Sequence, residues 1–93
     1  MTQVQQTSLS AYQSIRRDLG RRQNQVFNVF LSYPNYNYTN TEISRVLGLP
    51  INQITPRVYE LRRLGLLVEA TRRSCLVTGR TCIAWRLNKE LEI

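Results

Sequence analysis

The 93-residue sequence predicts one small α+β domain, with helices up to about residue 64 and a β-hairpin after them. Apolar residues in the first part recur at spacings of three or four, which is typical of amphipathic helices. From residue 66 onward the period changes to the alternation that is typical of strands. A chain of this length leaves no room for a second domain, because even one small domain buries only modestly more than half of its unfolded surface.

Both ends of the chain are predicted to lie outside the main domain, which covers residues 21–88. Residues 1–7 are rich in Gln and Thr and have little to bury, so we expect a disordered leader, and residues 89–93 form a short tail. Residues 8–20 predict an amphipathic helix that stops at Gly20. Its apolar stripe consists of Leu9, Tyr12, Ile15 and Leu19. This stripe must be covered, either by the domain itself or by the same helix of a second copy.

A second helix is predicted from Arg21, and its apolar stripe has to pack against another element. The stripe consists of Val26, Phe27, Phe30 and Leu31. Pro34 ends this helix, because the residue before a proline is driven away from helical backbone angles. Residues 32–40 are rich in turn formers and alternate tyrosine with asparagine, which predicts a loop ending in a very short strand.

Two further helices are predicted around a tight glycine turn. Thr39 and Glu42 form a T-x-x-E capping box that opens a helix, and Gly48 closes it. After a turn of Gly48 and Leu49, with Pro50 in or beside it, the next helix continues to Gly65. Its inward residues are Ile54, Val58, Leu61 and Leu64. Two short helices joined in this way define a helix-turn-helix.

Pro56 leaves two starts open for the second of these helices, because proline removes one helical hydrogen bond and belongs in a first turn. The helix begins near Ile51 with a loose first turn, or Thr55 caps a shorter helix with Pro56 at its first position. We favour the start near Ile51.

Residues 66–87 predict a β-hairpin with Thr78-Gly79 as its turn. A two-residue turn there would place Cys75 directly opposite Cys82. A disulfide or a shared metal would then be conceivable, but a reducing compartment and the lack of further ligands favour two reduced packing residues. Trp85 alternates with apolar neighbours, so we expect it to pack beneath the hairpin.

The charge balance indicates a polyanionic partner. Thirteen Lys and Arg against six Asp and Glu give a net charge of +7, and twelve of the thirteen cations are Arg, whose planar fork grips phosphate and guanine edges. A chain with no His and two Cys cannot build a Cys/His zinc centre or a Ser-His-Asp relay, and it has no Gly-rich phosphate loop. We therefore expect a binding module that uses no metal and no cofactor, rather than an enzyme. Neither a long apolar run nor a secretory signal is present, so a cytoplasmic protein away from the membrane is expected.

The order of these elements over residues 21–88 resembles winged helix-turn-helix DNA-binding domains. The segments TNTEISRVLGL and ELRRLGLLVE are similar to those of small MarR-like regulators, and ITPRVYELRRLG, RRSCLVTGRT and AWRL resemble winged-helix proteins of bacteriophages and prophages. The resemblance implies a three-helix core with a β-hairpin wing, plus an additional N-terminal helix. It also implies a sequence-specific double-stranded DNA-binding protein, a phage or prophage transcriptional regulator in the host cytoplasm. The long dimerisation helices of large MarR-like regulators are absent, so no small-molecule ligand is implied.

On a winged helix, residues 51–64 would be the recognition helix, and the face opposite its apolar stripe would enter the major groove. Asn52 and Thr55 on that face are the candidates for reading bases, since Asn can pair with adenine and a threonine methyl can touch thymine. The groove walls and phosphates would be met by the remaining polar residues of the helix, Gln53, Arg57, Tyr59, Arg62 and Arg63. The wing candidates are Arg72, Arg73 and Arg80, clustered at the hairpin tip.

Other interpretations stay open. The wing arginines could simply protect an edge strand, and the whole domain could dock a host or phage protein instead of DNA. A more remote alternative is binding of left-handed nucleic acid through Tyr59 and Trp85. If the helix at residues 8–20 pairs two copies, a homodimer would bind an inverted repeat with its recognition helices about 34 Å apart.

Overall fold

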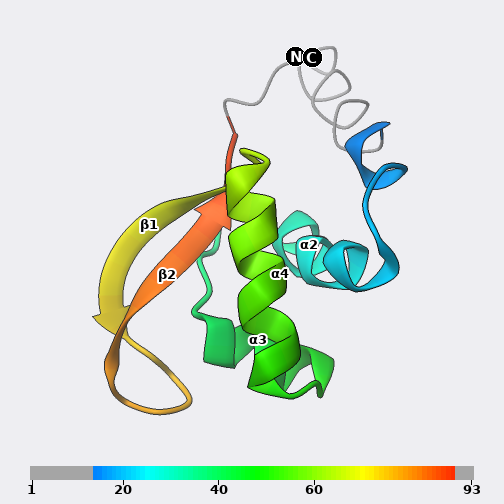
Figure 1. Cartoon of the computed structure of the whole chain (residues 1–93). Helices are drawn as coiled ribbons and strands as arrows, with labels where there is room; N and C mark the ends of the chain where they lie inside the picture. The colour runs from blue at the N-terminus through cyan, green and yellow to red at the C-terminus, as the bar shows by residue number, and fades with distance from the viewer. Residues whose placement is uncertain (1–13, 90–93) are drawn as a thin grey trace.

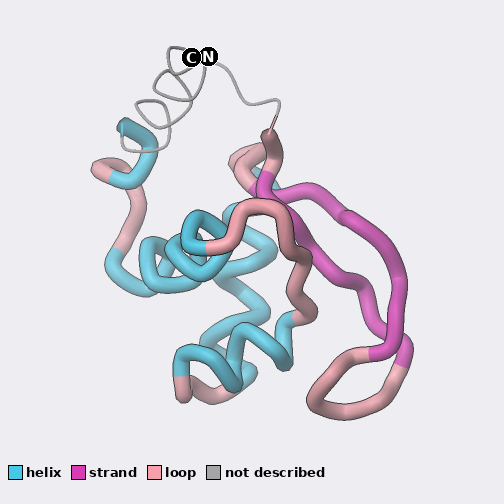
Figure 2. Tube along the Cα trace, turned by 180° about the vertical axis from the view of Figure 1, so that it is seen from behind, coloured by secondary structure: helices cyan, strands magenta, loops and turns pink. Residues whose placement is uncertain are grey.

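The computed structural model describes residues 14–89, which form an α+β, winged-helix-like fold. Its elements are the helices α2 (Arg21–Ser32), α3 (Asn40–Leu47) and α4 (Ile51–Arg63), followed by the antiparallel strands β1 (Leu67–Ser74) and β2 (Thr81–Leu87). The hairpin stands beside α4 on the side away from α2, as Figures 1 and 2 show from opposite directions. The predicted order of helices and hairpin is confirmed.

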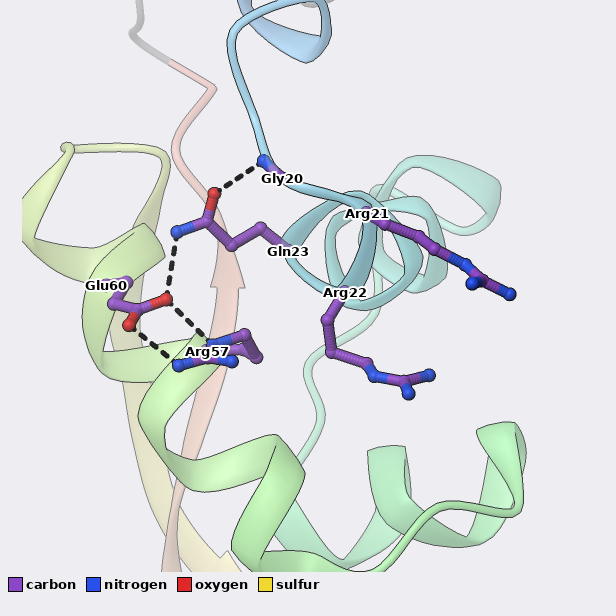
Figure 3. A pocket seen from close by; sticks show the side chains of 6 residues that line it. All are labelled: Gly20, Arg21, Arg22, Gln23, Arg57 and Glu60. Atoms are coloured by element: carbon purple, nitrogen blue, oxygen red, sulfur yellow. Dashed lines mark hydrogen bonds and ion pairs between the residues drawn. The ribbon is translucent and has the colours of Figure 1, made fainter.

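One apolar core joins the three helices to the base of the hairpin. Its largest fully buried side chains include Phe27, Phe30, Ile43, Ile54, Leu61, Leu67 and Leu87. A polar contact supports the same packing on the surface, where Gln23 of α2 donates from Nε2 to Oε1 of Glu60 on α4 at 2.8 Å (Figure 3). The helices α2 and α4 are therefore held together by the apolar core and by this hydrogen bond at the surface.

The inward face predicted for α4 is confirmed with one exception. Ile54, Val58 and Leu61 are buried, but Leu64 is 57% exposed. The helix ends at this residue, and Gly65 takes a positive φ of 81° that reverses the chain direction. Leu66 then enters the core in place of Leu64.

The capping box of α3 is confirmed. Thr39 Oγ1 accepts from the N–H of Glu42 at 3.2 Å, and Glu42 Oε1 accepts from the N–H of Thr39 at 3.1 Å. Gly48 ends the helix with a φ of 68°, as the C-terminal glycine pattern predicts.

The helix α4 begins at Ile51, after Pro50, which settles the two starts in favour of the longer helix. Pro56 therefore lies inside α4, where it has no N–H to donate to the carbonyl of Asn52. Both residues are exposed, so water can satisfy that carbonyl. The missing hydrogen bond is tolerated because it lies on the solvent face of the helix.

The predicted two-residue turn of the hairpin is wrong. Ser74 pairs with Thr81, which leaves a six-residue loop from Cys75 to Arg80, and Cys82 faces Arg73 rather than Cys75. Cys75 turns inward to 2% exposure, and its N–H donates to the Arg80 carbonyl at 2.8 Å to close the wider loop. Burial of this side chain thus sets the register. Both cysteines are free thiols, as expected for reduced packing residues.

The short strand expected before α3 is present as a single bridge between Tyr38 and Trp85, with N···O distances of 2.9 and 2.8 Å. The Tyr38 ring meets Phe30 edge-on, with ring centroids 5.4 Å apart. Trp85 is half-buried and packs against the core, as predicted. This bridge attaches the loop after α2 to the base of the wing.

The predicted N-terminal helix is described only in part. Residues 14–16 are helical and the chain turns over residues 17–19, where Ile15 and Leu19 pack against the core. The leader at residues 1–7, the stripe residues Leu9 and Tyr12, and residues 90–93 lie outside the described part. Half of the apolar stripe is thus covered by its own domain.

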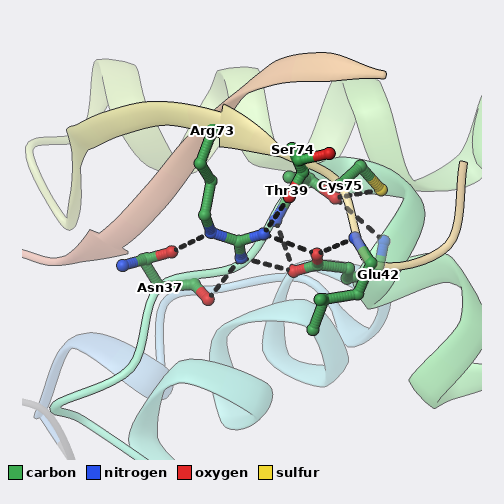
Figure 4. Close-up of polar contacts among 7 residues, drawn as sticks. Asn37, Thr39, Glu42, Arg73, Ser74 and Cys75 are labelled. Atoms are coloured by element: carbon green, nitrogen blue, oxygen red, sulfur yellow. Dashed lines mark hydrogen bonds and ion pairs between the residues drawn. The ribbon is translucent and has the colours of Figure 1, made fainter. Parts of the chain in front are cut away.

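A cluster of charged and polar groups, here called the wing clamp, fixes the hairpin to α3 (Figure 4). Arg73 of β1 donates to both carboxylate oxygens of Glu42, at 2.8 and 2.7 Å, and to Asn37 Oδ1 and its carbonyl, at 2.7 and 3.1 Å. The N–H of Leu76 donates to Glu42 Oε2 at 2.8 Å. Glu42 is only 7% exposed, so its charge depends on these partners.

Acid should weaken the fold through Glu42. Hydrogen bonds from Arg73 lower the pKa of this carboxyl from 4.5 to about 2; burial opposes the shift, and the N–H groups of Leu76 and Thr39 add to it. Because the folded pKa lies below the unfolded one, the stabilisation is present above about pH 4.5 and is lost as the pH falls toward 2. We expect a loss of about 3 kcal/mol of unfolding free energy across this window.

Urea denaturation of the wild type and of Glu42→Gln at a series of pH values measures this loss. The variant should be less stable at neutral pH, and the difference between the two proteins should shrink toward zero in acid. A difference that stays constant over the whole series would contradict the pKa assignment of Glu42.

Candidate nucleic-acid interface

The outward face of α4 carries the residues that the sequence placed there. The exposed members are Asn52, Gln53, Thr55, Pro56, Tyr59, Arg62 and Arg63. Their exposure is confirmed, while their role in binding stays a prediction. All of these residues except Pro56 carry polar or charged groups, so the face is mainly polar.

The first turn and a half of α4 presents unpaired hydrogen-bonding groups to solvent. Within residues 14–89, the side-chain amides of Asn52 and Gln53 have no hydrogen-bond partner. The hydroxyl of Thr55 accepts a long bond of 3.4 Å from Asn40 of α3 and keeps its own proton free for donation. These groups can donate and accept at a base edge without first breaking an internal contact.

Two arginines near the end of α4 lie over aromatic rings. Arg63 is 5.7 Å from the centroid of the Tyr59 ring and donates to its hydroxyl at 3.2 Å, so the two side chains form one exposed cationic unit. Arg62 lies 5.6 Å from the centroid of the Trp85 ring and so links α4 to the hairpin. Arg62 therefore faces the wing, whereas Arg63 stays on the outward face.

Arg57 is held by an internal partner. It forms an ion pair of 2.8 Å with Glu60, whose pKa is lowered by hydrogen bonds from Gln23 and then from Arg57 itself. These residues line a shallow pocket between α2 and α4, in which Arg21 and Arg22 point away from Glu60 (Figure 3). The charge of Arg57 is thus balanced locally.

The three wing arginines do not form one free cluster. Arg72 and Arg80 are exposed, but Arg73 belongs to the wing clamp, with its side chain 27% exposed beside Glu42. The predicted cluster of three arginines at the hairpin tip thus differs from the structure, while their contact with DNA stays a prediction. The local sequence could not show this, because Glu42 lies 31 positions before Arg73. The burial of the capping-box carboxylate, which requires a cation nearby, is visible only in the structure.

Cys75 has a role that its sequence position did not reveal. Burial alone would raise the pKa of its thiol, but hydrogen bonds from Thr39 and from Val77 and Thr78 outweigh it, and the pKa falls from 9.0 to about 7. The sulfur lies 3.1 Å from the Thr39 hydroxyl. The N-cap of α3 is therefore bonded to the wing loop as well as to its own helix.

The N-terminal end of α4 and the loop of the wing reach the same end of the molecule (Figures 1 and 2). A recognition helix contacts bases with its N-terminal residues, and a wing contacts the neighbouring backbone or minor groove.

Within residues 14–89, no helix is long and apolar enough to cross a membrane, and no group of three His, Cys, Asp or Glu side chains could hold a metal ion.

Comparison with known proteins supports the fold. No family model matches the chain, and no curated protein matches its sequence. Solved structures do match, among them a possible transcriptional regulator from Methanosarcina mazei Go1, with a TM-score of 0.65 and 15% sequence identity. The match covers 85% of this chain but only 64% of that protein. At this identity the likeness establishes the fold alone.

The two neighbouring arginines of β1 should behave differently on substitution. Arg73→Ala leaves the buried Glu42 carboxylate without its cation, so we expect a loss of about 3 kcal/mol of unfolding free energy. Arg72→Ala removes an exposed side chain and should stay within about 0.5 kcal/mol of the wild type. Urea denaturation at neutral pH compares them, and equal stabilities would contradict the wing clamp.

Proposed function

We propose that this protein binds double-stranded DNA in a sequence-specific manner and regulates transcription, as a phage or prophage regulator does. The observation that carries the proposal is the outward face of α4, which has unpaired amides at its N-terminal end and the cationic unit of Tyr59 and Arg63 toward its C-terminal end. The net charge of +7 supplies the long-range attraction to phosphate. The structural neighbour, a possible transcriptional regulator, gives additional support.

In the proposed complex α4 lies in the major groove. Asn52 pairs with an adenine edge, Thr55 places its methyl against a thymine, and Gln53 reaches a base or the groove wall. The Tyr59 hydroxyl and the Arg63 guanidinium contact one phosphate strand together. The wing adds Arg72 and Arg80 at the adjacent backbone.

Three of the arginines predicted to contact DNA also have partners within the domain, and their role in binding stays a prediction. Arg57 is paired with Glu60, Arg73 with Glu42, and Arg62 covers Trp85. Full use of Arg57 or Arg73 on DNA would first break an ion pair. The direct contact set is therefore smaller than the charge of the chain suggests.

A protein-docking function is the alternative, and it is favoured by two exposed apolar residues beside the helix-turn-helix turn, Val46 and Ile51, which are 63% and 44% exposed. They stand among polar side chains, which suits a groove better than an apolar docking face. Binding of left-handed nucleic acid has less support, because Trp85 is half-buried and Arg62 lies over its ring.

Selection of bound sequences from a random duplex pool tests the proposal. A DNA-binding regulator should enrich one motif, and an inverted repeat would indicate two copies on the DNA, whereas a single half-site would indicate one. A pool that shows no enrichment at low salt would overturn sequence-specific binding.

The affinity for duplex DNA should fall steeply with salt. We expect a slope of about −3 per bound copy in a plot of log affinity against log salt, for phosphate contacts by Arg63, Arg72 and Arg80. Fluorescence anisotropy of a labelled duplex measures the slope. Binding that hardly depends on salt, or no binding at low salt, would favour the docking function.

Base reading and phosphate contact should separate by mutation. Asn52→Ala should cost about 1 to 3 kcal/mol on the selected duplex and little on random DNA, while Arg72→Ala should weaken both duplexes alike. Asn35→Ala, an exposed asparagine of the loop after α2, serves as the matched control and should change neither. Equal losses for Asn52→Ala on both duplexes would exclude a base-reading role.

A further inference from the structure

An apolar side chain stands at the tip of the wing. Leu76 is 87% exposed, more than any other large hydrophobic residue of the described chain, and Val77 beside it is 36% exposed. The other exposed residues of the loop, Thr78, Gly79 and Arg80, are not large hydrophobic residues. A single exposed leucine is ordinary, so its significance depends on how it is held and on what surrounds it.

The loop cannot withdraw Leu76 into the protein. Its N–H is bonded to Glu42 Oε2 at 2.8 Å, and the buried position next to it is already filled by Cys75. The other end of the loop is fixed as well, since the N–H of Gly79 donates to the Cys75 carbonyl at 2.8 Å and Ser74 Oγ to the Gly79 carbonyl at 3.0 Å. The wing clamp and these hydrogen bonds therefore hold the backbone of the loop, and the Leu76 side chain projects from it into solvent.

The surroundings of Leu76 are cationic. Arg72 and Arg80, both exposed, lie in the strand before the loop and at the end of the loop. Within residues 14–89 no salt bridge involves either of them. An apolar tip flanked by free arginines fits the minor groove, whose negative potential attracts arginine and whose base steps accept an apolar wedge.

We propose that Leu76 is a wedge that enters the minor groove next to the site of α4, partly unstacks one base step and kinks the duplex; this rests on the proposed DNA-binding function. The N-terminal end of α4 and the wing loop lie at the same end of the molecule, so both can contact one duplex (Figure 1). The backbone hydrogen bonds of the loop fix the position from which this side chain projects.

The test uses the tightest-binding duplex recovered from the random pool, carrying a donor and an acceptor dye at its two ends. Wild-type protein should increase energy transfer, because a kink of about 20° to 90° brings the ends closer together. Leu76→Ala should abolish the increase and weaken binding by about tenfold, with an unchanged salt slope because no charge is removed. Leu76→Phe should keep the kink, since a larger apolar side chain still separates the step.

Leu64→Ala is the matched control, because Leu64 is also an exposed leucine but lies at the opposite end of α4 from the wing tip. It should bind and bend DNA like the wild type. If the wild type binds the duplex without raising energy transfer, or if Leu76→Ala bends it equally, the wedge is overturned and the DNA-binding function stands. If the wild type binds no duplex at all, the proposed function fails and the wedge with it.

Discussion

The carboxylate of Glu42 is the interaction on which the rest of the structure depends. It caps α3 by accepting a hydrogen bond from the N–H of Thr39. It also accepts hydrogen bonds from both terminal nitrogens of Arg73 and from the N–H of Leu76. One buried charge thus joins the start of the helix-turn-helix to the tip of the wing. This contact holds the outer part of the hairpin against α3, while the core cluster holds its base through Leu67 and Leu87.

The distribution of paired and free cations decides which surface can meet a polyanion. Arg57 and Arg73 are neutralised by Glu60 and Glu42, so they stabilise the fold and add little to the outer potential. Exposed arginines remain on the outward face of α4 and on the wing. Two acidic residues, Glu42 and Glu60, therefore do more than lower the net charge, since they decide which arginines of β1 and α4 stay free.

Local patterns predicted most of the fold, since the relevant physics lies within a few residues. The capping box of Thr39, the left-handed Gly48 and the start of α4 at Ile51 all depend on neighbours in sequence. The hairpin turn and the pairing of Arg73 depend on contacts with the distant Thr39 and Glu42, and these were missed. The outward face of α4 was predictable from helical periodicity, but the ion pair of Arg57 with Glu60 and the contact of Arg62 with Trp85 were not.

The position of Trp85 makes its fluorescence a probe of how the hairpin sits against α4. It is the single tryptophan of the sequence, and it lies where the hairpin, the loop bearing Tyr38 and the Arg62 guanidinium meet. Indole emission responds to a nearby cation and to water, so any movement of the wing relative to α4 changes the colour or intensity of this one fluorophore. Displacement of the hairpin on meeting a partner can therefore be followed in the unlabelled protein.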